Sequence, residues 1–262
     1  MPEVDVLCWN PVRPVYSGRL GRVIRFRRPV NNFGDMLGPM IVQAMLSRYG
    51  LTGAAAARDA QLLTVGSVMH LAKPGAVVWG TGVNFKVDPA DDAMTSLDVR
   101  AVRGPRTRDF LESRGVAVPE VFGDPALLLP EVFPEFGHQS PTRDVTVVPN
   151  LNERSDYGRS ARVLHPRRPP IECLKVIGAS RLVVGSSLHG IIVAEAYGIP
   201  ARLVRPRTES ELKYDDYYLA TGRPDWSAAA SVEDAIKLGG ERPPKWSSGP
   251  LVDTFPIDLW TR

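Results

Sequence analysis

The sequence of 262 residues is poor in cysteine, lacks a long apolar segment and carries little net charge. Its two cysteines, Cys8 and Cys173, lie far apart and form no Cys-x-x-Cys pair, which argues against a disulfide framework or a structural zinc site. No apolar run approaches the roughly 18 residues of a membrane-spanning helix, and the first residues lack the pattern of a signal peptide. A net charge of +3 does not favour a nucleic-acid-binding protein. We therefore expect a soluble, cytoplasmic protein that binds no nucleic acid, and leave peripheral membrane contact open.

Short apolar runs alternate with helical patterns along the chain, and several runs end in turns rich in Gly, Ser or Asn. This rhythm is typical of βαβ units and of a parallel sheet. The runs predict strands over 4–9, 61–65, 76–79, 97–102, 121–122, 144–148, 182–184 and 201–204, and a further extended piece over 21–26. The helical patterns predict helices over 36–49, 54–60, 105–115, 171–177, 186–198 and 231–238.

The stretch 130–142 is rich in Pro, Glu and Gly and has no apolar periodicity. We interpret it as a linker, because such composition is typical of a connection between domains. The sequence therefore predicts an α/β protein of two domains, 1–130 and 131–262. The C-terminal tail is expected to pack back across the split.

The stretch 171–204 organises the second domain, because it predicts a helix, a strand, a helix and a strand in succession. Ser186 and Ser187 can cap the second helix, and His189 and Gly190 then lie on its first turn. Ligands of open α/β sheets bind at the carboxyl ends of strands, and a helix N-terminus suits an anion. His189 is therefore a candidate catalytic residue, with a structural role as the alternative. A serine hydrolase is disfavoured, because histidine stands where the nucleophile elbow needs glycine.

Three further turns are candidates for ligand contact. Arg103 ends a predicted strand, and its guanidinium suits bidentate binding of phosphate or carboxylate, although a solvated arginine gives the same pattern. The turn with Asn32, Gly34 and Asp35 precedes a predicted helix, which Asp35 could instead simply cap. A short Gly-x-Gly motif that could cradle phosphate, in itself a weak signal, is formed by Gly80, Thr81 and Gly82.

The segment Glu211–Tyr218 mixes tyrosine with charged residues. It predicts either an ordinary amphipathic surface or a wall that binds sugar, since tyrosine rings stack on the apolar faces of sugars. Lys213 could add a cation to an anion site, with Tyr214 beside it. No His-x-His, His-Glu-x-x-His or acidic cluster is present, so we expect no metal.

Several motifs together resemble those of the polysaccharide pyruvyltransferases. They are NFGD at 32–35, VRGPRT at 102–107, FGDPALLLP at 122–130 and GSSLHGIIVAEAYGIP at 185–200. The segment KYDDYYLATGR at 213–223 is similar to a tail motif of the bacterial exopolysaccharide branch. The order and spacing of the motifs carry the resemblance, which spans most of the chain. Many members have arginine immediately before the Leu-His pair, where this chain has Ser187.

The resemblance implies a fold similar to the GT-B glycosyltransferases, with two Rossmann-like domains facing across a cleft and the first domain on the acceptor side. It implies transfer of the pyruvyl group of phosphoenolpyruvate onto two hydroxyls of a sugar, free or lipid-linked, without a cofactor. Arg103 and Lys213 would bind the donor's anionic groups, and His189 would be catalytic or donor-binding. Two alternatives stay open, a GT-B glycosyltransferase that uses a nucleotide sugar and a non-catalytic saccharide-binding protein. The acceptor and the oligomeric state are not fixed by the sequence.

Overall fold

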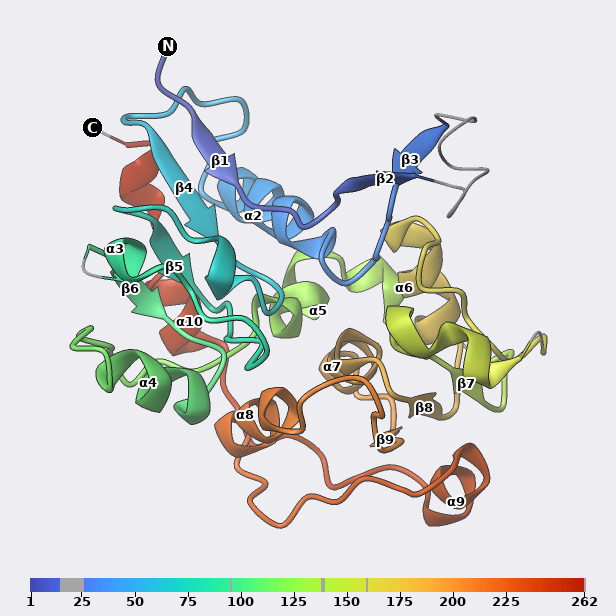
Figure 1. Ribbon diagram of the computed structural model, residues 1–262. Coiled ribbons are helices and arrows are strands. Elements are labelled where there is room, and N and C mark those ends of the chain that lie inside the picture. Colours follow the sequence, from blue (N-terminus) through green and yellow to red (C-terminus); the bar gives the residue numbers. More distant parts are fainter. Residues whose placement is uncertain (15–25, 95, 138–139, 159, 262) are drawn as a thin grey trace.

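The computed structural model describes residues 1–14, 26–94, 96–137, 140–158 and 160–261. Its strands include two separate parallel sheets (Figure 1). The first sheet has the order β1 (Val4–Val6), β4 (Ala60–Leu63), β5 (Val77–Trp79) and β6 (Asp98–Ala101). The second has the order β7 (Thr146–Val147), β8 (Val183–Gly185) and β9 (Ala201–Leu203). The predicted α/β class with parallel sheets is therefore confirmed.

Successive residues of the first sheet face opposite helical layers, as the alternation of side chains along a strand requires. Leu62 and Val77 pack in one cluster with the apolar face of α2 (Leu37–Arg48). Leu63 and Val78 point the other way, into a cluster that includes Leu111 of α4 (Pro105–Glu112). The inner strands β4 and β5 are buried on both faces, which is why they read as short apolar runs in the sequence.

The second sheet is covered by α6 (Pro170–Gly178) and α7 (Leu188–Ala196), which pack against each other. Pro170 opens α6, and Ser187 caps α7, as the sequence predicts. Helix α7 is apolar nearly all round, because it lies between the second sheet and η2 (Pro125–Leu128) of the first half of the chain (Figure 1). The position of α7 brings its N-terminus to the junction of the two halves.

One buried cluster joins the two halves of the chain, since it contains Trp79 of β5 and Val183 of β8. The predicted linker contributes α5 (Leu129–Val132) and η3 (Pro134–Phe136) to this cluster, with Phe136 buried. Packing, and not sequence periodicity, specifies these short helices. The domain boundary at 130/131 stays a prediction.

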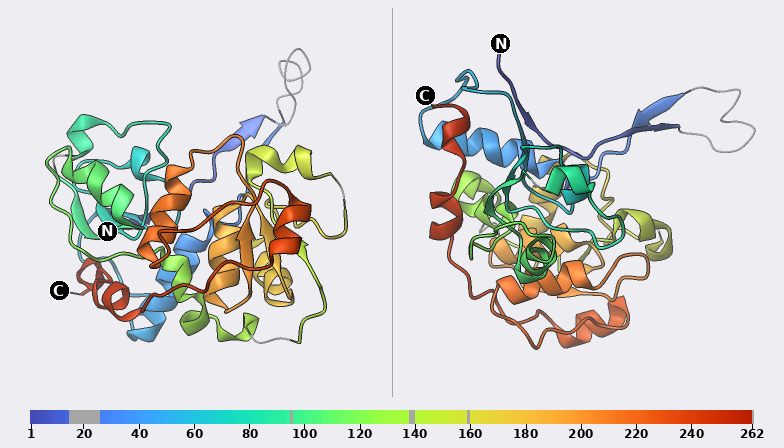
Figure 2. Two further views of the ribbon diagram at one scale, coloured as in Figure 1. Left: turned by 90° about the horizontal axis from the view of Figure 1, so that it is seen from below. Right: turned by 60° about the vertical axis from the view of Figure 1, so that its left-hand side comes forward.

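The C-terminal tail returns to the first sheet (Figures 1 and 2). The indole N–H of Trp79 donates to the carbonyl of Leu251 at 2.9 Å, in α10 (Gly249–Asp253). The Ala57 N–H donates to the carbonyl of Leu259 at 2.8 Å. The predicted helix over 54–60 is wrong, because this alanine-rich stretch is irregular and its backbone binds the tail.

The remaining elements connect these layers. They are η1 (Met69–Leu71), α3 (Asp91–Met94), η4 (Leu151–Tyr157), α8 (Leu212–Ala220), α9 (Val232–Leu238) and η5 (Ile257–Leu259). The strand predicted over 4–9 is shorter, and the extended piece predicted over 21–26 lies almost wholly outside the described residues. Within the described ranges, no helix combines the length and the apolar character needed to cross a membrane.

An antiparallel hairpin of β2 (Val12–Pro14) and β3 (Arg27–Pro29) extends away from both sheets (Figures 1 and 2). Asn10 and Asn31 clamp its base. The Asn31 backbone N–H donates to Oδ1 of Asn10 at 2.8 Å, and Nδ2 of Asn10 donates to Oδ1 of Asn31 at 3.1 Å. Asn31 has a positive φ of 56°, a conformation that asparagine tolerates better than most residues. These two hydrogen bonds fix the point at which the hairpin leaves the rest of the protein.

Candidate active site

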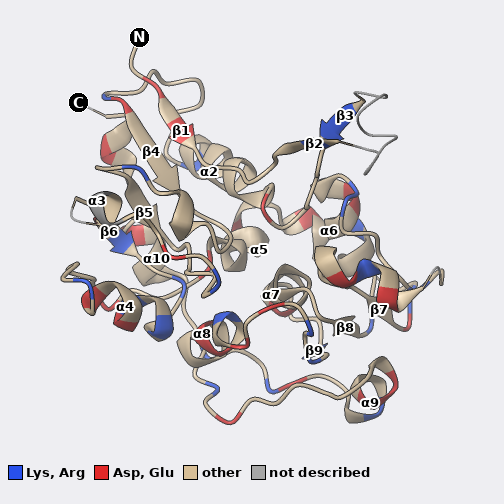
Figure 3. Cartoon of the chain, in the orientation of Figure 1, with Lys and Arg blue, Asp and Glu red and all other residues tan. Residues whose placement is uncertain are grey.

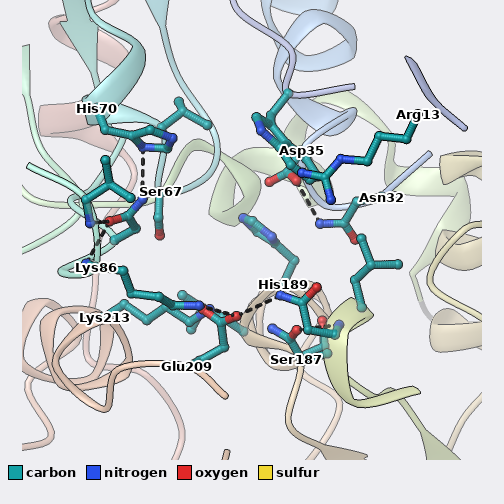
Figure 4. Close-up of a pocket in the computed structure, with 18 residues that line it drawn as sticks. Arg13, Asn32, Asp35, Ser67, His70, Lys86, Ser187, His189, Glu209 and Lys213 are labelled. Carbon is teal, nitrogen blue, oxygen red and sulfur yellow. Dashed lines mark hydrogen bonds and ion pairs between the residues drawn. The ribbon is translucent and has the colours of Figure 1, made fainter. Parts of the chain in front are cut away.

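A cleft of about 420 Å³ lies where loops from both halves of the chain converge (Figure 4). Its first wall comes from the 32–35 turn before α2 and from loops that follow β4 and β5. Its second wall comes from η4, the start of α7 and the segment 209–213 before and within α8. The strands of both parallel sheets therefore direct their following loops at one cleft, the usual place for a ligand in α/β proteins.

His189 lies in this cleft on the first turn of α7, as the sequence predicts. Its imidazole is 11% exposed, and its Nε2 has no hydrogen-bond partner among the described residues. The ring packs directly on Gly34. A Cβ atom added to Gly34 would stand 2.2 Å from Nδ1 of His189, so only glycine leaves room for the ring. Gly34 therefore forms the floor of the histidine site.

Asp124 stands behind His189 and was not among the predicted site residues. Its carboxylate is fully buried, and Oδ2 lies 3.7 Å from Nε2 of His189. Oδ1 accepts from the Ala126 N–H at 3.0 Å, which fixes the carboxylate at the start of η2. Among the residues that the structure describes, Oδ2 has no hydrogen-bond partner. A buried carboxylate oxygen without a partner is costly, and the nearby Nε2 atom makes His189 and Asp124 a candidate functional pair.

Asp35 and Asn32 bring a second carboxyl group to the cleft. Nδ2 of Asn32 donates to Oδ2 of Asp35 at 2.7 Å (Figure 4). Burial raises the pKa of Asp35, whereas His189, the Asn32 hydrogen bond and Lys213 oppose this rise. Asp35 therefore holds a proton at higher pH than an ordinary aspartate, which suits a group that exchanges protons with a ligand.

Lys213 and Lys86 share one carboxylate at the opposite end of the cleft from Arg13 (Figure 4). The ammonium groups of Lys213 and Lys86 each lie 2.8 Å from a different oxygen of Glu209. Burial lowers the pKa of Lys213, and Glu209 partly offsets that effect. Two cations against one carboxylate leave this end of the cleft with an excess positive charge. Such a site favours an anionic ligand.

The N-terminus of α7 closes the space between these groups. Ser187 lines the cleft, and its hydroxyl accepts from the Gly190 N–H at 3.2 Å. Gly190 packs on Val148, where an added Cβ would stand 2.7 Å from the valine side chain. Ser186 does not line the cleft. Its carbonyl accepts from the Tyr214 hydroxyl at 2.7 Å, which ties α8 to the cap of α7.

Arg103 lies behind the cleft wall with a fully buried guanidinium. Its Nε donates to Asp216 at 2.9 Å, and the two terminal nitrogens donate to the Ser67 hydroxyl at 2.6 Å and to the Val83 carbonyl at 3.1 Å. These bonds tie α8 to the first sheet. The hydrogen bond to Ser67 connects Arg103 to the cleft lining. Donor binding by Arg103 stays a prediction, whereas its contacts indicate that it supports the fold.

The Gly80-Thr81-Gly82 turn also lies away from the cleft lining. An added Cβ on Gly80 would stand 2.4 Å from the Pro125 side chain, and one on Gly82 would stand 2.2 Å from the Arg103 guanidinium. The Thr81 hydroxyl donates to the Gly66 carbonyl at 2.9 Å. The described contacts of this turn are packing contacts, and its role in substrate binding stays a prediction.

The structure thus divides the predicted site residues into two groups. Those that line the cleft are Asn32, Asp35, Ser187, His189 and Lys213. Those that support it from behind or lie beside it are Gly34, Gly80, Thr81, Gly82, Arg103, Ser186, Gly190 and Tyr214. Asp124 and Glu209 were not predicted from the sequence. Asp124 follows a predicted strand within the motif at 122–130, and Glu209 precedes Lys213 by four residues, so each had an available signal.

Among the residues that the structure describes, no group of three or more His, Cys, Asp or Glu side chains could hold a metal ion. Activity without a metal stays a prediction.

The chain is similar to a curated protein, to a solved structure and to one family model. The chain is 27% identical over 204 residues to the "Succinoglycan biosynthesis protein ExoV" of Rhizobium meliloti (strain 1021), a match that covers 73% of this chain and 62% of that relative. The fold resembles the crystal structure of a functional uncharacterized protein, KP1_0663, from Klebsiella pneumoniae subsp. pneumoniae NTUH-K2044. That likeness has a TM-score of 0.51 at 13% identity and covers 76% of this chain and 89% of the other. The family model described as polysaccharide pyruvyl transferase matches residues 70–207, more than half of the chain. The chain therefore belongs to the polysaccharide pyruvyl transferase family.

Proposed function

We propose that the chain transfers the pyruvyl group of phosphoenolpyruvate onto two hydroxyls of one sugar, forms a pyruvate ketal and releases phosphate. The observation that carries this proposal is the arrangement of His189 between the carboxyl groups of Asp35 and Asp124, beside the two lysines at the far end of the cleft. Ketal formation needs groups that exchange protons, and the donor needs cations. Both kinds of group line or adjoin the same cleft.

Lys213 and Lys86 are the proposed ligands of the donor's phosphate. Phosphoenolpyruvate brings a phosphate and a carboxylate on neighbouring atoms, so its binding needs several positive groups at one end of the cleft. The two ammonium groups converge on Glu209 in the free protein. The donor would compete with Glu209 for them. The backbone N–H groups at the start of α7 provide a further place for one of the two anions.

The first half of the proposed reaction adds one sugar hydroxyl to the donor. Asp35, in its protonated form, gives its proton to the methylene carbon, which becomes the methyl group. The sugar oxygen bonds to the neighbouring carbon and its hydroxyl proton passes to His189. Asp124 stabilises the resulting imidazolium through the oxygen that faces Nε2 at 3.7 Å. General acid–base groups of this kind typically contribute roughly 10²- to 10⁴-fold to a rate.

The second half closes the ketal and restores both groups. The carbon–oxygen bond to phosphate breaks, and the imidazolium of His189 gives its proton to the departing phosphate. The second sugar hydroxyl bonds to the same carbon, and its proton returns to the Asp35 carboxylate. One hydroxyl proton thus leaves on phosphate and the other replaces the proton that entered the methyl group. The cycle needs no cofactor and no metal.

We propose in addition that the two sheets represent the two Rossmann-like domains of a GT-B-like arrangement, with the first half on the acceptor side. Support comes from the cleft, which takes one wall from each half of the chain. Closure of such a cleft on the donor would exclude water from the reacting groups. The same proposal covers the acceptor, free or lipid-linked, and the place of the reaction, in the cytoplasm or at a membrane surface.

The test is a screen of free and lipid-linked oligosaccharides with phosphoenolpyruvate, read as phosphate release together with the mass gain of one pyruvyl ketal. His189→Ala should lower turnover roughly 10²- to 10⁴-fold. His189→Asn separates catalysis from binding, because asparagine keeps a hydrogen bond but exchanges no proton. Near-normal turnover of His189→Asn at saturating donor would reduce His189 to a binding contact.

Thermal shift measurements separate the alternatives. Stabilisation by UDP or GDP and not by phosphoenolpyruvate would favour a nucleotide-sugar glycosyltransferase. Stabilisation by saccharide alone, without consumption of phosphoenolpyruvate, would favour a non-catalytic saccharide-binding protein. We expect stabilisation by phosphoenolpyruvate in the absence of both nucleotides, by the amount that mass action predicts for a ligand that binds the folded state.

A further inference from the structure

A second cavity, of about 540 Å³, lies under the hairpin and is strongly basic. Its lining residues are Arg28, Pro29, Val30, Asn31, Arg154, His165, Arg167 and Arg168. Figure 3 shows basic residues of β3 on the same side of the molecule as those that precede α6. No residue of this cavity lines the cleft that contains His189.

The four arginines come from three separate parts of the chain. Arg28 lies on β3, Arg154 lies on η4, and Arg167 and Arg168 lie in the turn before α6. His165 holds that turn, since its Nδ1 accepts from the backbone N–H of Arg167 at 3.1 Å. Four guanidinium groups therefore converge on one cavity from well-defined backbone positions.

Within the part of the chain that the structure describes, none of these four arginines forms an ion pair with an acidic side chain. Arg103, by contrast, is buried and paired with Asp216. The sequence from 6 to 34 contains no Asp or Glu at all. The pKa of His165 is lowered by burial and then by each of the four arginines, which agrees with their convergence. Unpaired like charges repel, so an anion would relieve the repulsion.

A smaller cavity of about 220 Å³ links this basic cavity to the cleft. It shares Arg28 and Arg167 with the basic cavity, and it shares Arg13 and Trp9 with the cleft. The basic cavity therefore continues from the end of the cleft where Arg13 lies, away from Lys213 and Lys86 (Figure 4). A ligand that fills the cleft can extend through the linking cavity to the arginines.

We propose that the basic cavity binds a diphosphate group that is attached to the saccharide acceptor. The planar guanidinium binds phosphate oxygens in pairs, and two linked phosphates offer four such groups more oxygen atoms to bind than a single phosphate or carboxylate does. The donor is excluded as the occupant, because its proposed ligands stand at the other end of the cleft. The assignment of the diphosphate to the acceptor rests on the proposed function, whereas diphosphate binding by the cavity does not.

Binding of inorganic pyrophosphate by calorimetry tests the cavity. The variant Arg167→Gln/Arg168→Gln removes two exposed arginines that have no ion pair in the described structure. The matched control Arg181→Gln/Arg242→Gln makes the same change in charge at arginines that are 65% and 56% exposed elsewhere. We expect pyrophosphate affinity to fall at least about tenfold in the first variant, a change of one decade in the dissociation constant, and to stay within about twofold of the wild type in the control.

Two outcomes would overturn the proposal that the basic cavity binds a diphosphate. Equal loss of pyrophosphate affinity in the variant and the control would overturn it, because net charge alone would then explain binding. Binding of vesicles that contain phosphatidylglycerol, without binding of soluble pyrophosphate, would also overturn it and assign the arginines to a membrane surface. Stabilisation by phosphoenolpyruvate should be unchanged in both variants. If phosphoenolpyruvate does not stabilise the wild type, the proposed function is overturned. Binding of pyrophosphate would then still test whether the cavity binds a diphosphate.

Discussion

Gly34→Ala is expected to disable His189 without replacing any ionisable side chain. An added Cβ would stand 2.2 Å from Nδ1, 2.5 Å from Cγ and 2.7 Å from Cβ of His189. Ordinary contact at that site begins at 3.4 Å, so the imidazole must move by about 1.2 Å. The backbone of Gly34 has no positive φ, so the effect of the substitution is steric.

The size of the effect follows from this displacement. A shift of about 1 Å in a catalytic group lowers a rate by roughly 10²-fold, and forcing extra volume into a packed site costs about 1–3 kcal/mol of unfolding free energy. The displaced ring also loses its place opposite Oδ2 of Asp124, now 3.7 Å from Nε2. Turnover should therefore fall about as far in Gly34→Ala as in His189→Ala.

The assay is phosphate release from phosphoenolpyruvate with the acceptor found in the screen, accompanied by urea unfolding. Gly249→Ala is the matched control, because the nearest atom to its added Cβ is 3.8 Å away. We expect the control to keep wild-type turnover and stability within about 1 kcal/mol. If Gly34→Ala folds normally and turns over within about twofold of the wild type, the ring position seen here is not the catalytic one.

Two further predictions concern buried charges, and a third concerns metal removal. Arg103→Met should lower the unfolding free energy by about 3–5 kcal/mol, since Asp216 is left buried without its partner. In urea unfolding, the double variant Arg103→Met/Asp216→Asn should recover part of that free energy. Unchanged stability of the single variant would instead favour ligand binding by Arg103. The raised pKa of Asp35 means that the folded state holds this proton longer than the unfolded state, so the unfolding free energy falls as pH rises from the ordinary aspartate value through the folded one. Asp35→Asn should remove that fall, and an identical pH profile would argue against a raised pKa. Enzyme treated with chelator should turn over at the normal rate, and restoration of a lost rate by Mg²⁺ would contradict the metal-free mechanism.

Local patterns predicted most of the elements that hold the site. The apolar run before Ser187 and the helical pattern after it placed His189 on the first turn of α7, because a strand, a cap and a helix each have signals a few residues long. The same holds for α2 and for α4, which begins at Pro105. The stretch 54–60 failed, because alanine favours a helix locally whereas contact with the tail decides its conformation.

The partners of each charged side chain were beyond the reach of the sequence. Arg103 and Asp216 are separated by 113 positions, yet their contact determines that the guanidinium faces the interior. Asp124 and His189 also come from different halves of the chain, so only their packing made a pair of them. The basic cavity was hidden in the same way, because a net charge of +3 averages over acidic residues that lie elsewhere.

The sequence by itself determined the α/β class, the cap that places His189 at a helix N-terminus, and the motifs that indicate the family. Tertiary structure alone decided which of the candidate residues meet in the cleft and which support it from behind. The physical reason is range. Strand, cap and turn preferences act over a few residues, whereas the burial of a charge and the space left by a glycine depend on atoms that the fold brings from distant parts of the chain.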